Sequence, residues 1–118
     1  MIEYGARAKR LPAPPHVVWD DLVARKRVGV RAWLALRGDE IEPEVLGAAR
    51  PHLVVWSSLW PARPDDRVEM TLTARGTETL LGFRLLAPGA PPGDDLTQRI
   101  RYRVNRLLYD DLRRSYDG

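Results

Sequence analysis

The sequence predicts an α+β protein in which an antiparallel β-sheet wraps around one long C-terminal helix. Residues 94–118 repeat apolar side chains at spacings of three and four, which is the period of an α-helix. Residues 67–75 alternate apolar and polar side chains, as a strand with one buried face does. The order along the chain is strand, helix, several strands and long helix. That order favours an antiparallel sheet over the strand–helix alternation of parallel sheets.

The first two elements are a strand and a short helix. Residues 2–10 alternate apolar and charged or small side chains, so we expect a half-buried strand. The prolines of residues 12–15 end it, because proline donates no backbone hydrogen bond, and they can open a helix at its first turn. That helix is predicted over residues 16–27, with Trp19 on the face that packs into the core.

The middle of the chain is predicted to form three strands. Residues 28–36 alternate, with Trp33 opposite the aliphatic face. After a turn, residues 41–46 return as a short strand, and Pro43 indicates that this strand lies at an edge of the sheet. Residues 52–60 are rich in Val, Leu and Trp, which is typical of a strand buried on both faces.

A hairpin and a loop precede the last helix. Residues 67–75 form its first strand, Gly76 lies in a short connection, and residues 79–87 form the second strand. Residues 88–93 hold three prolines and two glycines, so they are predicted as a loop.

The C-terminal helix is predicted over residues 94–118, with Asp95 as its N-cap and Gln98 as a capping-box partner. About twenty residues at roughly 1.5 Å each span about 30 Å, so this helix can cross a small domain. Its apolar stripe comprises Leu96, Ile100, Val104, Leu107, Leu108 and Leu112. The arginines between these positions are expected on the outer face, where they serve solubility and ion pairing. They are Arg99, Arg101, Arg103 and Arg106.

Length, cysteine content and charge exclude several kinds of site and of protein. The 118 residues suit a single domain, residues 1–118, with a real core. There is no cysteine, so disulfides, thiolate metal sites and cysteine nucleophiles are excluded, and we expect a cytoplasmic protein. No run has the length of a signal peptide core or a membrane span. Lys and Arg number 19 against 16 acids, a net charge of only +3, and nucleic-acid binding is not expected.

Several local patterns resemble one superfamily. The prolines of residues 12–15 precede a V-W-x-x-L run over residues 18–22, and residues 67–73 lead through a glycine turn into the G-T-E-T of residues 76–79. Together with the long last helix, these patterns are similar to the START-related SRPBCC superfamily of helix-grip proteins, which includes polyketide cyclases and lipid-transfer domains. The resemblance implies a sheet wrapped around the helix, often with an apolar cavity between them. Val28 follows the first helix almost at once, where family members commonly have a second short helix, so a smaller or closed cavity is expected.

Residues with catalytic or metal-binding chemistry are few. His16 and His52 have neither metal-ligand spacing nor a neighbouring nucleophile, and we read both as structural or solvent-facing. Glu40, Glu42 and Glu44 alternate and could bind a cation. A solvated strand edge is the favoured interpretation, since a row of like charges also discourages edge pairing. We predict no catalytic residue, no metal and no cofactor.

A ligand pocket combines apolar walls with a few polar groups, and aromatic residues of the predicted sheet and helix could supply one. The candidate residues are Trp33, Trp56, Ser58, Met70, Phe83 and Tyr102. Simple core packing explains the same residues equally well.

Three functions remain open. The first is binding or carriage of a small, largely apolar molecule. The second is a polyketide cyclase or dehydratase, for which Ser58, Tyr102 and Arg84 are the candidate acid, base or hydroxyl groups. The third is a protein-interaction module, comparable to the ATPase-activating co-chaperone branch of the superfamily, with an exposed apolar patch. The sequence also leaves open whether the chain forms a homodimer.

Overall fold

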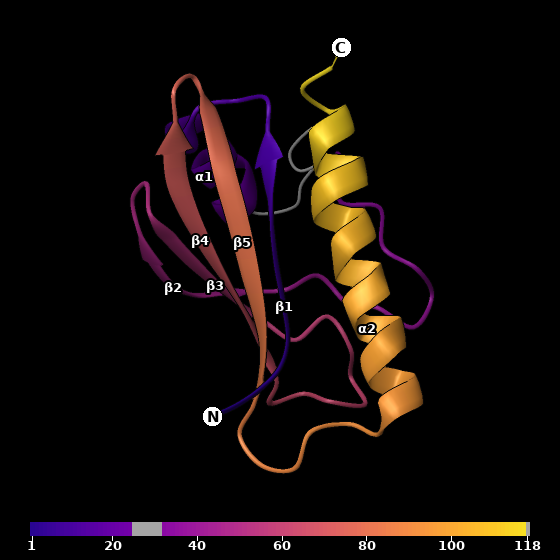
Figure 1. Ribbon diagram of the computed structural model, residues 1–118. Helices are drawn as coiled ribbons and strands as arrows, with labels where there is room; N and C mark the ends of the chain where they lie inside the picture. Colours follow the sequence, from indigo (N-terminus) through magenta and orange to yellow (C-terminus); the bar gives the residue numbers. More distant parts are fainter. Residues whose placement is uncertain (25–31, 118) are drawn as a thin grey trace.

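The computed structural model describes residues 1–24 and 32–117. Five strands and three helical segments follow one another in it (Figure 1). They are β1 (Ile2–Leu11), α1 (Pro15–Val23), β2 (Val45–Ala49), β3 (Leu53–Ser57), β4 (Arg67–Arg75), β5 (Glu78–Ala87), α2 (Asp94–Arg106) and the π-helical segment η1 (Leu107–Leu112). Since η1 continues α2 directly, the C-terminal helix runs over 19 residues.

The strands form one antiparallel sheet in the order β1-β5-β4-β3-β2. Alternate side chains of the β4–β5 hairpin point to one face, where Met70 lies opposite Phe83 and Leu72 opposite Leu81. Both helices share a single core with this face, while the side chains between these positions, such as Thr71 and Thr73, are exposed. The predicted α+β class, an antiparallel sheet packed around a long C-terminal helix, is confirmed.

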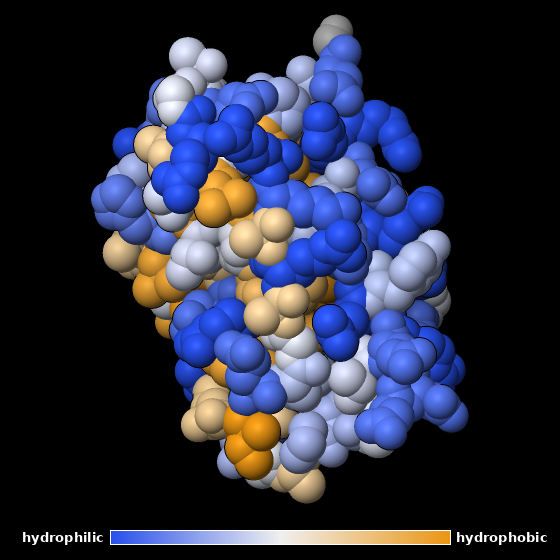
Figure 2. Space-filling model, in the orientation of Figure 1, coloured by the Kyte–Doolittle hydropathy of each residue, from blue (hydrophilic) through white to orange (hydrophobic). Residues whose placement is uncertain are grey.

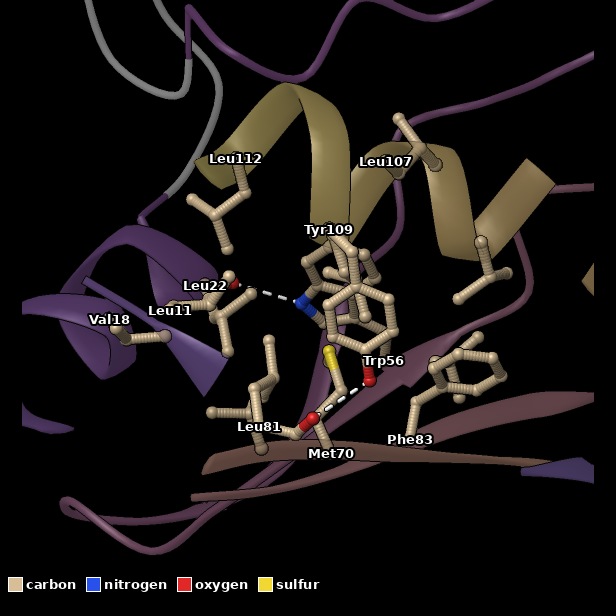
Figure 3. Packing of buried hydrophobic residues seen from close by; sticks show 14 of the residues in the cluster. Leu11, Val18, Leu22, Trp56, Met70, Leu81, Phe83, Leu107, Tyr109 and Leu112 are labelled. Atoms are coloured by element: carbon tan, nitrogen blue, oxygen red, sulfur yellow. Dashed lines mark hydrogen bonds between the residues drawn. The ribbon is translucent and has the colours of Figure 1, made fainter. Parts of the chain in front are cut away.

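The C-terminal helix closes the core through its apolar stripe. Figure 3 shows Leu107, Tyr109 and Leu112 above Trp56 and Met70. The Tyr109 hydroxyl lies 2.7 Å from the carbonyl oxygen of Leu81 and 3.0 Å from that of Arg7, so its single proton can be donated to either strand. Burial raises the pKa of Tyr109 above its ordinary value, which keeps this donor protonated.

The helix begins differently from the prediction. Gly93 occupies the N-cap position and no side chain caps the helix, so the predicted capping box of Asp95 and Gln98 is wrong. Asp94 and Asp95 lie instead in the first turn, where their charges favour the positive end of the helix dipole.

The β4–β5 hairpin is the best-predicted part of the chain. β4 has the predicted bounds and β5 begins one residue earlier than predicted. Gly76 has a φ of 63° in the connecting turn, a left-handed conformation that glycine adopts without steric cost.

The elements before this hairpin differ more. The first helix is Pro15–Val23, so it ends before Ala24, and residues 25–27 of the predicted helix lie outside the described residues. Of the strand predicted over residues 28–36, residues 28–31 lie outside the described part and residues 32–36 form no strand. The next strand is Val45–Ala49 instead of residues 41–46, although its edge position is confirmed. β3 is Leu53–Ser57, shorter than the predicted residues 52–60.

Burial before β2 does not follow the predicted alternation. Leu34 is buried in the core and Pro43 is also buried, while Glu40 is drawn inward by an ion pair described below. These residues lie six and three positions apart, so the segment lacks the period of two that a strand with one buried face would have.

Neither helix of the described chain combines the length and apolar character that crossing a membrane requires.

Candidate functional site

An open groove of about 840 Å³ runs along the first half of α2, between the helix and the segment that precedes β2. This volume is in the range of small-molecule sites. The lining residues are Arg37, Asp39, Glu40, Trp60, Asp95, Leu96, Gln98, Arg99, Ile100, Tyr102 and Arg103. Figure 2 shows that the outer side of α2, on the right, is mostly hydrophilic, while hydrophobic side chains on this face form separate patches.

A buried ion pair forms one wall of the groove. The Arg103 guanidinium donates through Nε to Glu40 Oε2 at 2.7 Å and through Nη2 to Glu40 Oε1 at 2.9 Å. The same Nη2 donates to the carbonyl oxygen of Ala35 at 2.8 Å, and the backbone N–H of Arg37 donates to Glu40 Oε1 at 2.8 Å. Arg103 is only 6% exposed and Glu40 only 9%, so this two-pronged contact fixes the segment before β2 against the helix.

The electrostatics of this pair favour the charged forms. Burial alone would raise the pKa of Glu40, but hydrogen bonds from the Arg103 guanidinium and the Arg37 backbone outweigh burial and lower that pKa below its ordinary value. The hydrogen bond to Glu40 raises the pKa of Arg103 despite its own burial. Asp111, 3.9 Å away, adds a second carboxylate to this cation.

The sequence-based interpretation of both residues was wrong. Glu40 was expected on a solvated strand edge and Arg103 on the outer face of the helix. The signal for Arg103 was present, because it lies three residues after Ile100 and four before Leu107, within the buried stripe. Nothing local marks Glu40 as its partner. Glu42 is half-buried, and Glu44, though exposed, precedes the strand, so the three glutamates do not share a strand face.

The groove also has apolar and aromatic lining residues, which are Trp60 and the α2 residues Leu96, Ile100 and Tyr102. A turn at Ser58 positions Trp60: the Ser58 hydroxyl donates to the Trp60 carbonyl oxygen at 3.1 Å, and the Trp60 backbone N–H donates back to Ser58 Oγ at 3.0 Å. Tyr102 is 58% exposed, and the guanidinium carbon of Arg106 lies 5.9 Å from the centroid of its ring.

Of the six candidate ligand-binding residues, only Tyr102 lines this groove. Trp56, Met70 and Phe83 lie in the core between sheet and helix (Figure 3). Trp33 packs against that core and stacks on Trp56 with ring centroids 6.2 Å apart and planes 19° from parallel. Trp56 also donates from Nε1 to the Leu22 carbonyl oxygen at 2.9 Å. Ser58 is buried in its turn. A ligand-binding role for these residues stays a prediction.

The three groups considered for catalysis are not brought together. Arg84 lies between Phe83 and Leu85, which point to the core, so Arg84 points to the opposite face of the sheet from α2. There it pairs with Glu69 at 2.8 Å and Glu3 at 3.3 Å.

The histidines and carboxylates do not build a metal site in the described chain. His16 and His52 are both exposed. No cluster of three or more histidine or acidic side chains within residues 1–24 and 32–117 has an arrangement that could hold a metal ion.

Comparison with known proteins gives structural neighbours only. No protein-family model matches the sequence, and no curated protein matches it either. The solution structure of the Aha1 dimer from Colwellia psychrerythraea matches with a TM-score of 0.70 and 13% identity, over 96% of this chain and 94% of that one. The crystal structure of CalU16 from Micromonospora echinospora matches with a TM-score of 0.62 and 19% identity, over 90% of this chain and 70% of that one.

A third solved structure is also similar. The crystal structure of Ara h 8.0201 matches with a TM-score of 0.54 and 9% identity, over 91% of this chain and 93% of that one. Identities this low establish a shared fold and carry no shared activity. The chain therefore has a helix-grip fold, which is the fold that its sequence resemblance implied.

Proposed function

We propose that this protein binds a small, largely apolar molecule with one polar group, and that it does so in the groove beside α2. The observation that carries the proposal is the composition of the groove, in which aromatic and aliphatic side chains line the same space as the buried, fully paired Glu40–Arg103 contact. Ligand sites typically combine apolar walls with a few fixed polar groups in this way.

The apolar part of the ligand would lie on Trp60, Leu96 and Tyr102. These three side chains line a space that is open to solvent. Covering them would remove apolar surface from water, at about 25 cal/mol per Å². Because the Ser58 turn holds the backbone of Trp60, binding would cost little backbone conformational entropy at this residue.

The polar part would lie at the rim. Arg37 and Arg99 are exposed there and form no ion pair with any other residue of the described ranges, and the exposed Asp39 and Asp95 lie on the same rim. Opposite charges are therefore balanced at the mouth of the groove, while Glu40 and Arg103 neutralise each other. This balance supports recognition of a single polar or charged group and disfavours polyanions such as nucleic acid.

The first test is native mass spectrometry of the purified protein, combined with extraction and identification of any small molecule that it retains. Binding is then measured by fluorescence titration, using that molecule or, if none is found, the apolar dye 1-anilinonaphthalene-8-sulfonate. Tyr102→Ala and Leu96→Ala should each weaken binding about three- to tenfold, because each removes one wall of the groove.

Ile2→Ala is the matched control, because Ile2 is 49% exposed on β1, which is not part of the groove. Equal affinities for Tyr102→Ala, Leu96→Ala and this control would refute the groove as the binding site.

A second candidate site is the interior around Trp33 and Trp56. One observation favours it: the Trp33 indole Nε1 is buried and has no hydrogen-bond partner among the described residues. Buried donors are normally paired, so an oxygen of a bound molecule would satisfy this one. Here Trp33→Phe, which keeps a ring and removes the donor, should weaken binding, while Tyr102→Ala should leave it unchanged. The opposite result would favour the groove.

A further inference from the structure

β2 leaves one side of the sheet without a partner strand. The strand order places β1 and β2 at the two edges. Along β1, helix side chains reach the edge: Tyr109 lies 3.0 Å from the carbonyl oxygen of Arg7, and Arg113 donates to that of Arg10 at 3.5 Å. β2 packs mainly against β3 and has no comparable cover in the described chain. An uncovered edge is a template for another strand.

The backbone of β2 shows which groups face outward. The Glu44 N–H donates to Ser57 Oγ at 2.7 Å and its carbonyl oxygen accepts from the Ser57 N–H at 2.8 Å, so Glu44 faces β3. At the other end, the Ala49 carbonyl oxygen accepts from the His52 N–H at 2.7 Å. Since neighbouring residues of a strand direct their backbone groups to opposite sides, Val45 and Ala48 direct theirs to the open side. Val45 and Ala48 are three residues apart and can still face the same side, because the register shifts between residues 45 and 47.

The side chains along this edge are apolar and small. Ile41, Val45 and Leu46 are 50%, 36% and 48% exposed, and they are among the few large hydrophobic residues exposed at all. The row of glutamates that was expected to protect this edge does not exist, because Glu40 is buried against Arg103. Only Glu44 remains exposed beside the strand.

The charges at the two ends of β2 indicate which strand would pair with it. Glu44 precedes the uncharged run of residues 45–49 and Arg50 follows it, and both are exposed. Arg50 also contacts Asp20 at 3.3 Å, but its side chain is still 54% exposed. Antiparallel pairing of two such strands places the acidic end of each beside the basic end of the other, whereas parallel pairing would place like charges together. The edge is thus complementary to itself.

We propose that two copies of this chain associate through antiparallel pairing of β2, about a two-fold axis near Leu46 and Gly47. The two five-stranded sheets then form one continuous sheet, and Leu46 packs against its counterpart. The strand is short and irregular, so the dimer should be weak, with a dissociation constant between about 1 μM and about 1 mM.

Sedimentation equilibrium of the full chain tests this directly, at concentrations from about 1 μM to about 1 mM. The average mass should rise from that of the monomer towards that of the dimer. Leu46→Lys should weaken association at least about tenfold, because two like charges meet near the axis. Ile2→Lys is the control, since Ile2 is 49% exposed on the other edge strand and should not affect association.

Cross-linking locates the axis. The chain has no cysteine, so Leu46→Cys introduces a single thiol. Near a two-fold axis this residue meets its own copy within the 4.4–6.8 Å that a disulfide spans, so mild oxidation should give a covalent dimer much faster than for Ile2→Cys. A monomeric mass at about 1 mM, or equal cross-linking of the two variants, would overturn the proposal. A dimer that Leu46→Lys leaves intact would do the same.

Discussion

The Glu40–Arg103 pair should be the most consequential polar contact of this protein, and Arg103→Met removes it while keeping the long apolar stem. The substitution takes away both bonds to Glu40 and the bond to the Ala35 carbonyl oxygen. Glu40 then keeps only the 2.8 Å bond from the Arg37 N–H. Removing one partner of a buried pair costs about 3–5 kcal/mol. Because the remaining carboxylate, whose side chain is 1% exposed, can take up a proton instead of staying charged, we expect the lower end, about 3 kcal/mol.

Guanidinium chloride unfolding, followed by tryptophan fluorescence, measures this cost as a shift in midpoint at constant slope. In a thermal melt the same cost corresponds to a decrease of about 10–15 °C. Arg106→Met is the control: Arg106 pairs with Asp110 at 3.2 Å on the same helix, but both side chains are nearly half exposed, so its loss should cost less than about 1 kcal/mol. The reasoning is refuted if Arg103→Met destabilises no more than Arg106→Met.

Two further experiments test whether the cost arises from leaving one charge of this pair unpaired. Combining Glu40→Leu with Arg103→Met removes both charges, so the double variant should be more stable than the sum of the single effects predicts. The pH dependence follows from the lowered pKa of Glu40: its stabilisation is present above the unfolded pKa of about 4.3 and is lost as pH falls through the folded value. The stability difference between the wild type and Glu40→Gln should therefore shrink in acid.

Three other predictions concern the core and the groove. Val104→Asp should cost about 3–5 kcal/mol in urea unfolding, because Val104 is 1% exposed, and a near-native midpoint would mean that another helix face packs inward. Tyr109→Phe should cost about 1–3 kcal/mol and should flatten the loss of stability above about pH 10, because ionising a hydroxyl whose pKa is raised by burial opposes folding. Identical alkaline unfolding curves would contradict this. Ser58→Ala should loosen Trp60 and weaken dye binding in the groove about threefold, with a red shift in tryptophan emission, whereas unchanged affinity would show that the turn does not position Trp60.

The elements that could be predicted are those whose pattern has a single cause. In β4, each second side chain enters the core and the others face water, so the period of two could be read without knowledge of the rest of the chain. The helical stripe from Ile100 to Leu112 is similar, because one face of the helix lies on the sheet throughout. These two patterns also fixed the fold class.

The parts that could not be predicted depend on contacts between distant residues. Glu40 and Arg103 lie 63 positions apart, and no local pattern pairs them. The segment before β2 has an alternating sequence but is irregular and buries Leu34, Glu40 and Pro43 through tertiary contacts, and the groove is built on this segment. Tyr102, which lies off the buried stripe of the helix, lines the groove, but Trp56, Met70 and Phe83, which were expected around it, lie in the core instead.

The way Glu40 holds its segment to the helix has a consequence for motion. Local opening of a protein has to break only the contacts of the part that moves, so the free energy for detaching the segment around Glu40 is set largely by its bonds to Arg103. Amide hydrogen exchange at Glu40, whose N–H donates to the Arg37 carbonyl oxygen at 3.0 Å, would report this opening separately from global unfolding. A molecule bound against the Glu40–Arg103 contact would slow that exchange in proportion to its own binding. Exchange at the Glu40 amide would therefore report how much of the groove is occupied.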